Sequence, residues 1–332
     1  RRVDDLLVEK ARALLDRDPT ESIAWLKRPR TSPPGAATIA AWAEERGVAE
    51  QVLRGHRGPV TTVAYSPDGK LLATGGDDKR VVLWNVETGQ AHELGGHTDR
   101  VTRVAFAPDG NLLASASYDK TIRLYHEDGS LFGVLSGHQA PVKSLAFSGD
   151  SKKLCSVGAD GEVRVWDPMK GGSERHGAPA DRDAFCSFSP DGQCLLSGSH
   201  AGALRLTHLL GGAERILGGD AGSVRSAAFS PDGKTIAAAG DDGAVRLWPI
   251  EGGPPLVLRS DGSSVQALAY APDGTHLATG SMNGAVRLWD VAAGTSWIVS
   301  EHAERIAALT FSPDGRYLAS SGWDKIVRVR DL

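Results

Sequence analysis

The chain has little cysteine: three residues in 332, with no CxxC spacing between them. Such a set argues against a secreted disulfide scaffold and against a cysteine-rich zinc site. The sequence also lacks a run of about 18 apolar residues and a signal-peptide pattern, so it predicts no membrane-spanning helix. We therefore expect cytoplasmic localisation in a reducing compartment and no membrane contact.

An excess of charge of either sign is absent too. The 37 Lys and Arg residues and 41 Asp and Glu residues give a formal net charge of −4. This balance argues against a general nucleic-acid or membrane-surface binder.

What the chain does have is a repeat. The stretch 53–85 contains a Ser-Pro-Asp-Gly turn at 66–69, and corresponding turns follow at intervals of 41 residues. The seven turns start at Ser66, Ala107, Ser148, Ser189, Ser230, Ala271 and Ser312. A constant period in the low forties indicates a repeat architecture in which each copy is one supersecondary unit.

Each copy carries the pattern of short strands separated by turns. In the first copy, β-branched and apolar residues at 60–65, 71–74 and 81–84 predict three strands, and 91–94 predicts a fourth. Proline and glycine in the 66–69 turn suit a tight reversal between the first two strands. Four antiparallel strands cannot bury both faces alone, so the copies are expected to stack around an axis.

With Gly55-His56 near the start of a copy and Trp84 near its end, residues 51–332 resemble a WD-repeat β-propeller. The resemblance implies an all-β, seven-bladed propeller at 50–332 that follows a short N-terminal α-helical segment at 1–49. The last copy lacks an outer strand, so 51–54 is predicted to complete the last blade and close the ring.

The first 49 residues have helical rather than strand periodicity. Apolar residues at helical spacing predict a helix over 3–15, and further short helices are predicted over 21–27 and 36–46. Their apolar faces need a covering surface, either the propeller or an upstream domain. The segment resembles those preceding C-terminal propellers of large bacterial signalling proteins, which implies one domain of a longer chain.

A His, a Ser or Thr, an Asp and a Trp recur in the copies, as in the set His56, Thr74, Asp78 and Trp84. An enzyme needs one triad in one cleft, whereas these sets recur around a ring, so we interpret them as buried hydrogen-bond networks. Blades two and seven lack the Trp, blades five and six lack the His, and blade four keeps only Ser197. In blades five and six, Trp248 and Trp289 are expected mainly to pack.

Two other residue groups receive structural interpretations. Blade four gathers His176, Cys186, Cys194, His200 and His208, but their columns place no four ligands together, so we predict no metal. An arginine column recurs at Arg123, Arg164, Arg205, Arg246, Arg287 and Arg328. We interpret this column as a solvated strand position rather than a nucleic-acid track.

Three columns differ from copy to copy, and the resemblance places them on the narrow face of the ring, around the central channel. This is where WD-repeat proteins most often meet partners. The predicted partner-binding residues are Arg100, Tyr118, Lys143, Arg182, Arg225, Met282, Arg305 and Trp323. Arginine and aromatic residues are common interface anchors, and five basic residues favour an acidic or phosphorylated peptide.

The prediction is therefore a non-enzymatic interaction or sensing module with a protein or peptide partner, no cofactor and no nucleic acid. One alternative is a metal-dependent or other enzyme at the channel mouth, although Asp77, Asp241 and His200 are few ligands for a metal. Another is a pure scaffold without a defined ligand.

Overall fold

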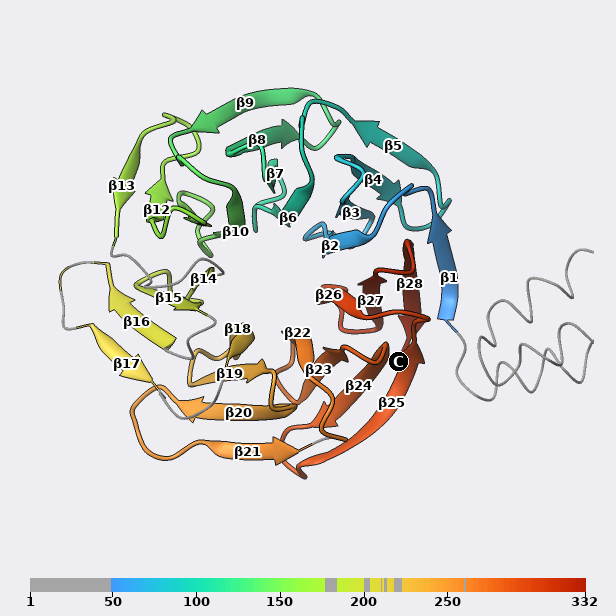
Figure 1. Cartoon of the computed structure of the whole chain (residues 1–332), viewed down its shortest axis with the longest axis vertical. Helices are drawn as coiled ribbons and strands as arrows, with labels where there is room; N and C mark the ends of the chain where they lie inside the picture. The colour runs from blue at the N-terminus through green and yellow to red at the C-terminus, as the bar shows by residue number, and fades with distance from the viewer. Residues whose placement is uncertain are drawn as a thin grey trace, which may run out of the picture.

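The computed structural model describes residues 49–176, 184–199, 204–209, 211, 214–217, 223–259 and 261–332. The helices predicted within 1–46 lie outside these residues. The described chain forms an all-β propeller in which seven four-stranded sheets surround a common axis (Figure 1). In the described residues, no helix is long and apolar enough to cross a membrane.

The first six blades each contain four consecutive strands, from the innermost to the outermost. Blade one comprises β2 (Val60–Tyr65), β3 (Leu71–Gly76), β4 (Val81–Asn85) and β5 (Ala91–Leu94). Blade two comprises β6 (Val101–Phe106), β7 (Leu112–Ser117), β8 (Thr121–His126) and β9 (Leu131–Ser136). Blade three comprises β10 (Val142–Phe147), β11 (Leu154–Gly158), β12 (Val163–Trp166) and β13 (Ser173–Arg175).

The other half of the ring repeats this arrangement. Blade four comprises β14 (Ala184–Phe188), β15 (Cys194–Ser199), β16 (Leu204–His208) and β17 (Arg215–Leu217). Blade five comprises β18 (Val224–Phe229), β19 (Thr235–Gly240), β20 (Ala244–Pro249) and β21 (Leu256–Arg259). Blade six comprises β22 (Val265–Tyr270), β23 (His276–Ser281), β24 (Ala285–Asp290) and β25 (Thr295–Glu301).

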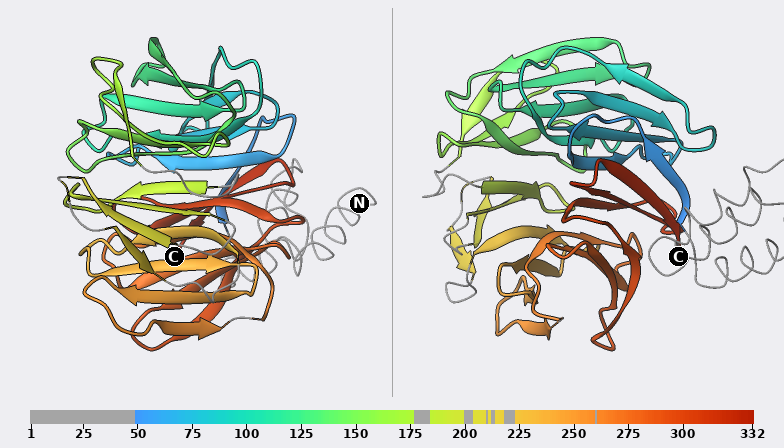
Figure 2. Two further views of the ribbon diagram at one scale, coloured as in Figure 1. Left: turned by 60° about the vertical axis from the view of Figure 1, so that its left-hand side comes forward. Right: turned by 45° about the vertical axis from the view of Figure 1, so that its right-hand side comes forward.

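Blade seven combines the two ends of the described chain. Its inner strands are β26 (Ile306–Phe311), β27 (Tyr317–Gly322) and β28 (Ile326–Asp331), and its outer strand is β1 (Ala49–Arg54). β1 runs antiparallel to β28, with Val52 opposite Arg328 and Leu53 opposite Val327. The strand includes the segment 51–54 that was expected to close the ring, and the side views show β1 against the last blade (Figure 2).

The turn at 66–69 shows why the repeat folds locally as the sequence predicts. The Ser66 hydroxyl donates to the Asp68 carboxylate at 2.7 Å and accepts from the Leu71 N–H at 2.9 Å. Gly69 has φ +74°, in the left-handed region that glycine adopts without strain. The turn therefore fixes the hairpin between β2 and β3 with its own side chains.

The core lies between neighbouring blades rather than within one. For example, Val63 and Trp84 of blade one pack in one cluster with Ala308 and Val327 of blade seven. Hydrogen bonds also join blades: the Thr61 hydroxyl donates to the Val101 carbonyl of blade two at 2.6 Å. Each sheet thus supplies the apolar surface that its neighbour needs.

Candidate functional site

The candidate site lies at one end of the blades, which we call the narrow face. It is formed by the loops that precede the innermost strands and the loops between the second and third strands. A backbone hydrogen bond joins these two loops in blade after blade, as from Tyr118 N–H to the Arg100 carbonyl at 3.0 Å. The same bond runs from Trp323 to Arg305 at 3.0 Å and from Met282 to Ser264 at 2.8 Å. The column that contains Arg100 and Arg305 therefore lies beside the column that contains Tyr118, Met282 and Trp323.

Three predicted residues form one cluster between blades two and three. The Arg100 guanidinium carbon lies 3.5 Å from the centre of the Tyr118 ring, and Lys143 Nζ lies 4.3 Å from the same centre. Lys143 also hydrogen-bonds the Tyr118 hydroxyl. All three side chains are partly exposed. Tyr118 is thus held by two cations, a geometry in which the ring face attracts positive charge.

A second pair lies in blade seven. The Arg305 guanidinium carbon is 3.4 Å from the centre of the Trp323 ring, so the arginine stacks on the indole. Burial lowers the pKa of Arg305, and the charge of Arg225 lowers it further, whereas the charges of Asp77 and Glu304 raise it. The positive charges of blades five and seven are therefore close enough to interact unfavourably.

The remaining predicted residues are less uniform. The exposed Arg225 makes a two-pronged ion pair with Asp241, with its Nε 2.8 Å and its Nη2 3.1 Å from the two carboxylate oxygens. This pairing first of all holds the pKa of Asp241 well below its usual range, against the effect of burial. Met282 is 50% exposed. Arg182 lies outside the described residues.

The predicted anchors Tyr118 and Trp323 each lie in contact with a cation. Tyr118 and Trp323 are only partly exposed, because the cations beside them cover their ring faces. Arg225 is already paired with Asp241. Whether these residues bind a partner stays a prediction, but their geometry is two cation–aromatic stacks and one ion pair.

Sequence reasoning missed Arg103. It lies on β6, one of the innermost strands around the axis (Figure 1). The side chain is exposed, and desolvation lowers its pKa. Its column reads Thr62, Arg103, Ser144, Phe185, Ser226, Ala267 and Ala308. Arg103 is the one charged residue in that column, and this signal could have identified it.

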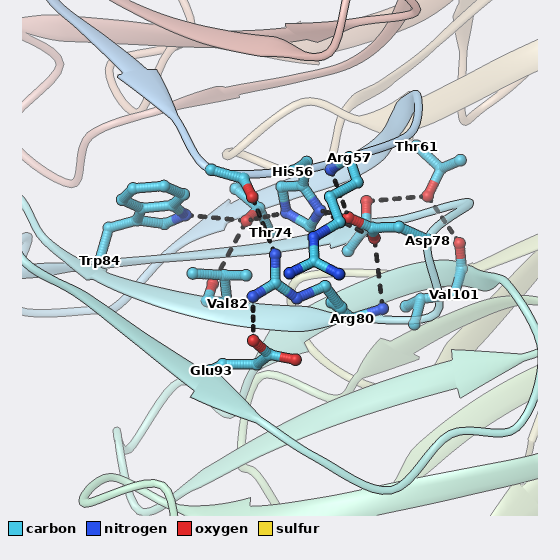
Figure 3. A network of polar contacts seen from close by, with 12 residues as sticks. His56, Arg57, Thr61, Thr74, Asp78, Arg80, Val82, Trp84, Glu93 and Val101 are labelled. Carbon is cyan, nitrogen blue, oxygen red and sulfur yellow. Dashed lines mark hydrogen bonds and ion pairs between the residues drawn. The ribbon is translucent and has the colours of Figure 1, made fainter.

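The recurring polar set of blade one forms the expected network (Figure 3). The Trp84 indole N–H donates to the Thr74 hydroxyl at 2.8 Å, and that hydroxyl lies 2.8 Å from His56 Nε2. His56 Nδ1 lies 3.0 Å from the Asp78 carboxylate, which also accepts from the Arg57 N–H at 2.7 Å. Burial raises the pKa of Asp78, but these hydrogen bonds outweigh it and the net pKa is lowered.

Blade three has the same complete network, with Trp166, Ser156, His138 and Asp160 joined by contacts of 2.8–3.1 Å. Burial of the imidazole lowers the pKa of His138. A neutral ring with its proton on Nδ1 can donate to Asp160 and accept from Ser156. The network is therefore a structural relay from indole to carboxylate, as the sequence analysis expected.

Blade two has the predicted shortened network. His97 contacts Ser115 and Asp119, both at 2.8 Å, while the Tyr125 hydroxyl donates to the Gly95 carbonyl at 3.3 Å. Burial lowers the pKa of His97. Burial raises the pKa of Asp119, but hydrogen bonds from neighbouring side chains lower it more, to about 2.

The expectation for Trp289 was wrong. Its indole N–H donates to the Thr279 hydroxyl at 2.9 Å, so this blade-six residue does more than pack. In blade five, the position equivalent to Thr279 holds Ala238, which offers no side-chain acceptor, and Trp248 packs in a hydrophobic cluster with it. Trp289 therefore differs from Trp248 because Thr279 carries a hydroxyl group and Ala238 does not.

The expectation of a solvated arginine column was also wrong. Arg164 is 7% exposed and donates to Glu162 at 2.8 Å and to Ser173 at 3.2 Å. Arg287 donates to Asp261 at 2.8 Å. Asp261 occupies the sequence position that holds a histidine in other blades. Carboxylates on neighbouring loops and strands compensate these guanidinium groups, so the column ties strands together.

The described residues offer one group of side chains with the spacing of a metal site, His138, Asp160 and Glu162. Both imidazole nitrogens of His138 are already in contact with the network, and Glu162 pairs with Arg164. In blade four, Cys194 Sγ lies 3.2 Å from His208 Nδ1, while His200 lies outside the described residues. Neither arrangement favours a metal.

Comparison with known proteins bears on the repeat itself. A family model described as "WD domain, G-beta repeat" matches six segments, which together cover more than half of the chain. They are 47–85, 89–126, 129–167, 212–249, 253–290 and 295–331. The matched segments leave out 168–211, where most of the divergent blade four lies.

Curated relatives match over short stretches. Telomerase protein component 1 of Rattus norvegicus is 51% identical over 39 residues, or 12% of this chain and 2% of the relative. Eukaryotic translation initiation factor 3 subunit I of Aspergillus niger is 42% identical over 52 residues, 16% of this chain and 15% of the relative. Nuclear distribution protein PAC1 of Coprinopsis cinerea is 42% identical over 55 residues, 17% and 12% respectively. The matched stretches thus span a small part of each relative's length.

Proposed function

The chain belongs to the WD domain, G-beta repeat family, and we propose that it is a non-enzymatic module that binds an acidic or phosphorylated peptide on the narrow face. Propellers of this family generally act in protein–protein interaction, which supports the class of function. The fold itself selects no partner, so the proposal depends on the side chains of the narrow face.

The observation that carries the proposal is the Arg305–Trp323 stack beside Arg225. The guanidinium carbon lies 3.4 Å over the centre of the indole, while desolvation and the neighbouring charge of Arg225 make the charged state of Arg305 less favourable. A carboxylate or phosphate at this place would relieve both effects and could accept two parallel hydrogen bonds. The indole edge beside it offers apolar surface for a neighbouring side chain of the peptide.

The cluster of Arg100, Tyr118 and Lys143 offers a second contact for an extended peptide. Its two cations lie in blades two and three, whereas Arg305 lies in blade seven. A segment that crosses the axis could therefore place one acidic group at each cluster. This arrangement favours a peptide with two negative groups over a single small anion.

The relatives support only the general class. One is named as a subunit of a translation initiation factor and another as a nuclear distribution protein. Since these relatives are eukaryotic, they give no support to the resemblance to bacterial signalling proteins. A cytoplasmic location and a place within a longer chain remain part of our proposal.

The test is a comparison of phosphorylated, acidic and neutral versions of one peptide library against the full chain. The best-binding peptide is then measured by surface binding kinetics. Arg305→Glu and Arg100→Glu should lower the association rate and its salt dependence, because charges at the rim steer the encounter. Trp323→Ala should raise the dissociation rate and cost about 2 kcal/mol if the indole is a hot spot.

Lys152→Glu is the matched control. Lys152 is an exposed residue of the 148–151 turn region, at the opposite end of blade three from Lys143. The substitution changes net charge as Arg305→Glu does but leaves the narrow face intact. Equal effects of the two reversals would indicate general attraction, and binding that no narrow-face variant alters would refute this site.

A further inference from the structure

Apolar side chains gather on the outer surface of blades five and six. Leu256 on β21 is 54% exposed and Trp297 on β25 is 45% exposed, and each has a second exposed apolar neighbour, Val257 and Ile298. In contrast, β5 and β13 expose alanine and polar residues on their outer surfaces. We call Leu256, Val257, Trp297 and Ile298 the outer belt.

The outer strand β25 contains a bulge after the exposed pair Trp297 and Ile298. The register passes from Arg287 opposite Ile298 to Val286 opposite Ser300, so Val299 has no partner residue on β24. Val299 is buried, while Trp297 and Ile298 before it remain exposed. Two consecutive large apolar residues therefore face solvent on β25, as Leu256 and Val257 do on β21.

The two strands of the belt belong to neighbouring blades that pack against each other. Leu258 of β21 packs in the same cluster as Trp289 and Val291 of blade six. A Cβ built on Gly294, just before β25, would lie 3.6 Å from Leu258. Figure 1 accordingly shows β21 and β25 as neighbours on the rim of the ring.

The belt is also next to the point where the described chain begins. Val299 packs with Leu309 and Phe311 of blade seven, and the outer strand of that blade is β1. On β1, Gln51 lies opposite Val329 of β28. The equivalent pair one repeat earlier is Trp297 of β25 opposite Leu288 of β24. The strand that carries Trp297 is therefore the repeat equivalent of β1 in one of the two blades next to blade seven, and the equivalent strand in the other, β5, exposes no large apolar side chain.

We propose that the outer belt is the docking surface of this chain's own segment 1–48. The sequence predicts an amphipathic helix over 3–15, with Leu6, Leu7, Leu14 and Leu15 at helical spacing. Attachment to blade seven gives such a helix an effective concentration of about a millimolar at the neighbouring blade. A tethered helix therefore needs fewer contacts to cover the belt than a free partner does.

A matched control surface exists elsewhere on the ring. Leu131 and Val134 on β9 are 52% and 43% exposed, so blade two has similar apolar exposure. Blade two lies two blades from blade seven in one direction, with blade one between them, and is separated from blade six by blades three to five in the other. The proposal predicts that segment 1–48 covers the outer belt and leaves β9 exposed.

Hydroxyl-radical footprinting of the full chain, read by mass spectrometry, tests this. We make a variant in which serine replaces Leu6, Leu7, Leu14 and Leu15. In this variant the oxidation rates of Trp297 and Leu256 should be at least threefold higher than in the parent. Met282, 50% exposed on the narrow face, serves as the internal dose reference. Oxidation of Leu131 should be the same in both proteins.

The reciprocal experiment uses limited proteolysis. Trp297→Ser with Ile298→Ser should speed cleavage within 1–48, whereas Leu131→Ser with Val134→Ser should not. Equal Trp297 oxidation in the parent and the leucine variant would overturn the proposal. Protection that increases with protein concentration would also overturn it, because a second copy would then be the occupant.

Discussion

The hydrogen bond from Trp166 to Ser156 gives the most direct test of the interpretation that the polar networks stabilise the fold. The indole N–H donates to Ser156 Oγ at 2.8 Å, and the same hydroxyl lies 2.8 Å from His138 Nε2. Trp166 is 2% exposed and Ser156 is fully buried. Trp166→Phe keeps an aromatic ring but removes the donor, so one acceptor position of a buried hydroxyl is left empty.

The size of the effect follows from two contributions. The lost hydrogen bond should cost about 1–3 kcal/mol, because the acceptor stays buried. The smaller ring adds a packing loss that has nothing to do with the network. A double-mutant cycle with Ser156→Ala removes this packing term, and the coupling free energy should be about 1–2 kcal/mol.

The assay is urea unfolding followed by far-ultraviolet circular dichroism at pH 7.5. Two tryptophans provide controls for the same substitution. Trp289→Phe removes a 2.9 Å bond to Thr279 and should resemble Trp166→Phe, whereas Trp248→Phe should cost less because Ala238 accepts nothing. A coupling below about 0.5 kcal/mol would refute the relay as a source of stability, since independent sites agree within that margin.

Two further predictions concern closure and pH. Deleting 1–54 removes β1 and exposes the edge of β28, so it should lower the melting temperature far more than deleting 1–35; equal melting temperatures in a calorimeter would contradict the role of β1. Acidification from pH 7.5 to 5 should lower the free energy of unfolding, because burial lowers the pKa of His97 and His138 and the unfolded chain then binds protons that the fold excludes. The loss of unfolding free energy begins as pH falls below about 6.5 and reaches at most about 1.4 kcal/mol per pH unit for each imidazole. Urea titrations at several pH values measure this loss. A constant free energy of unfolding between pH 7.5 and 5 would contradict the prediction.

The fold could be predicted from the sequence because the information is repeated. Each turn such as 66–69 carries its own hydrogen-bonding side chains, and each set such as His56 and Asp78 joins positions 22 residues apart. A constant period turns one local pattern into a ring of seven blades. Individual departures in blade four do not alter this pattern.

The candidate site was predicted less completely, because its geometry depends on contacts between different loops. The columns located Arg100 and Arg305, but spacing alone did not show that they cover Tyr118 and Trp323. The arginine column was wrongly assigned to solvent for a related reason. Four of its members pair with acids at differing positions, such as Glu162 for Arg164 and Asp261 for Arg287.

The stacked geometry of the narrow face limits what a partner can gain there. Because Arg305 already covers one face of Trp323, a partner that needs that ring face must first displace a 3.4 Å contact. A partner that instead binds the outer side of the guanidinium keeps the stack and gains a charge-assisted hydrogen bond on a fixed plane. In our proposal the anionic group therefore binds Arg305, with Trp323 supporting the arginine as well as offering its edge. Under this arrangement, Arg305→Lys should weaken peptide binding although the charge is kept. An ammonium group has no planar face to stack on the indole and cannot donate two parallel hydrogen bonds to one anionic group.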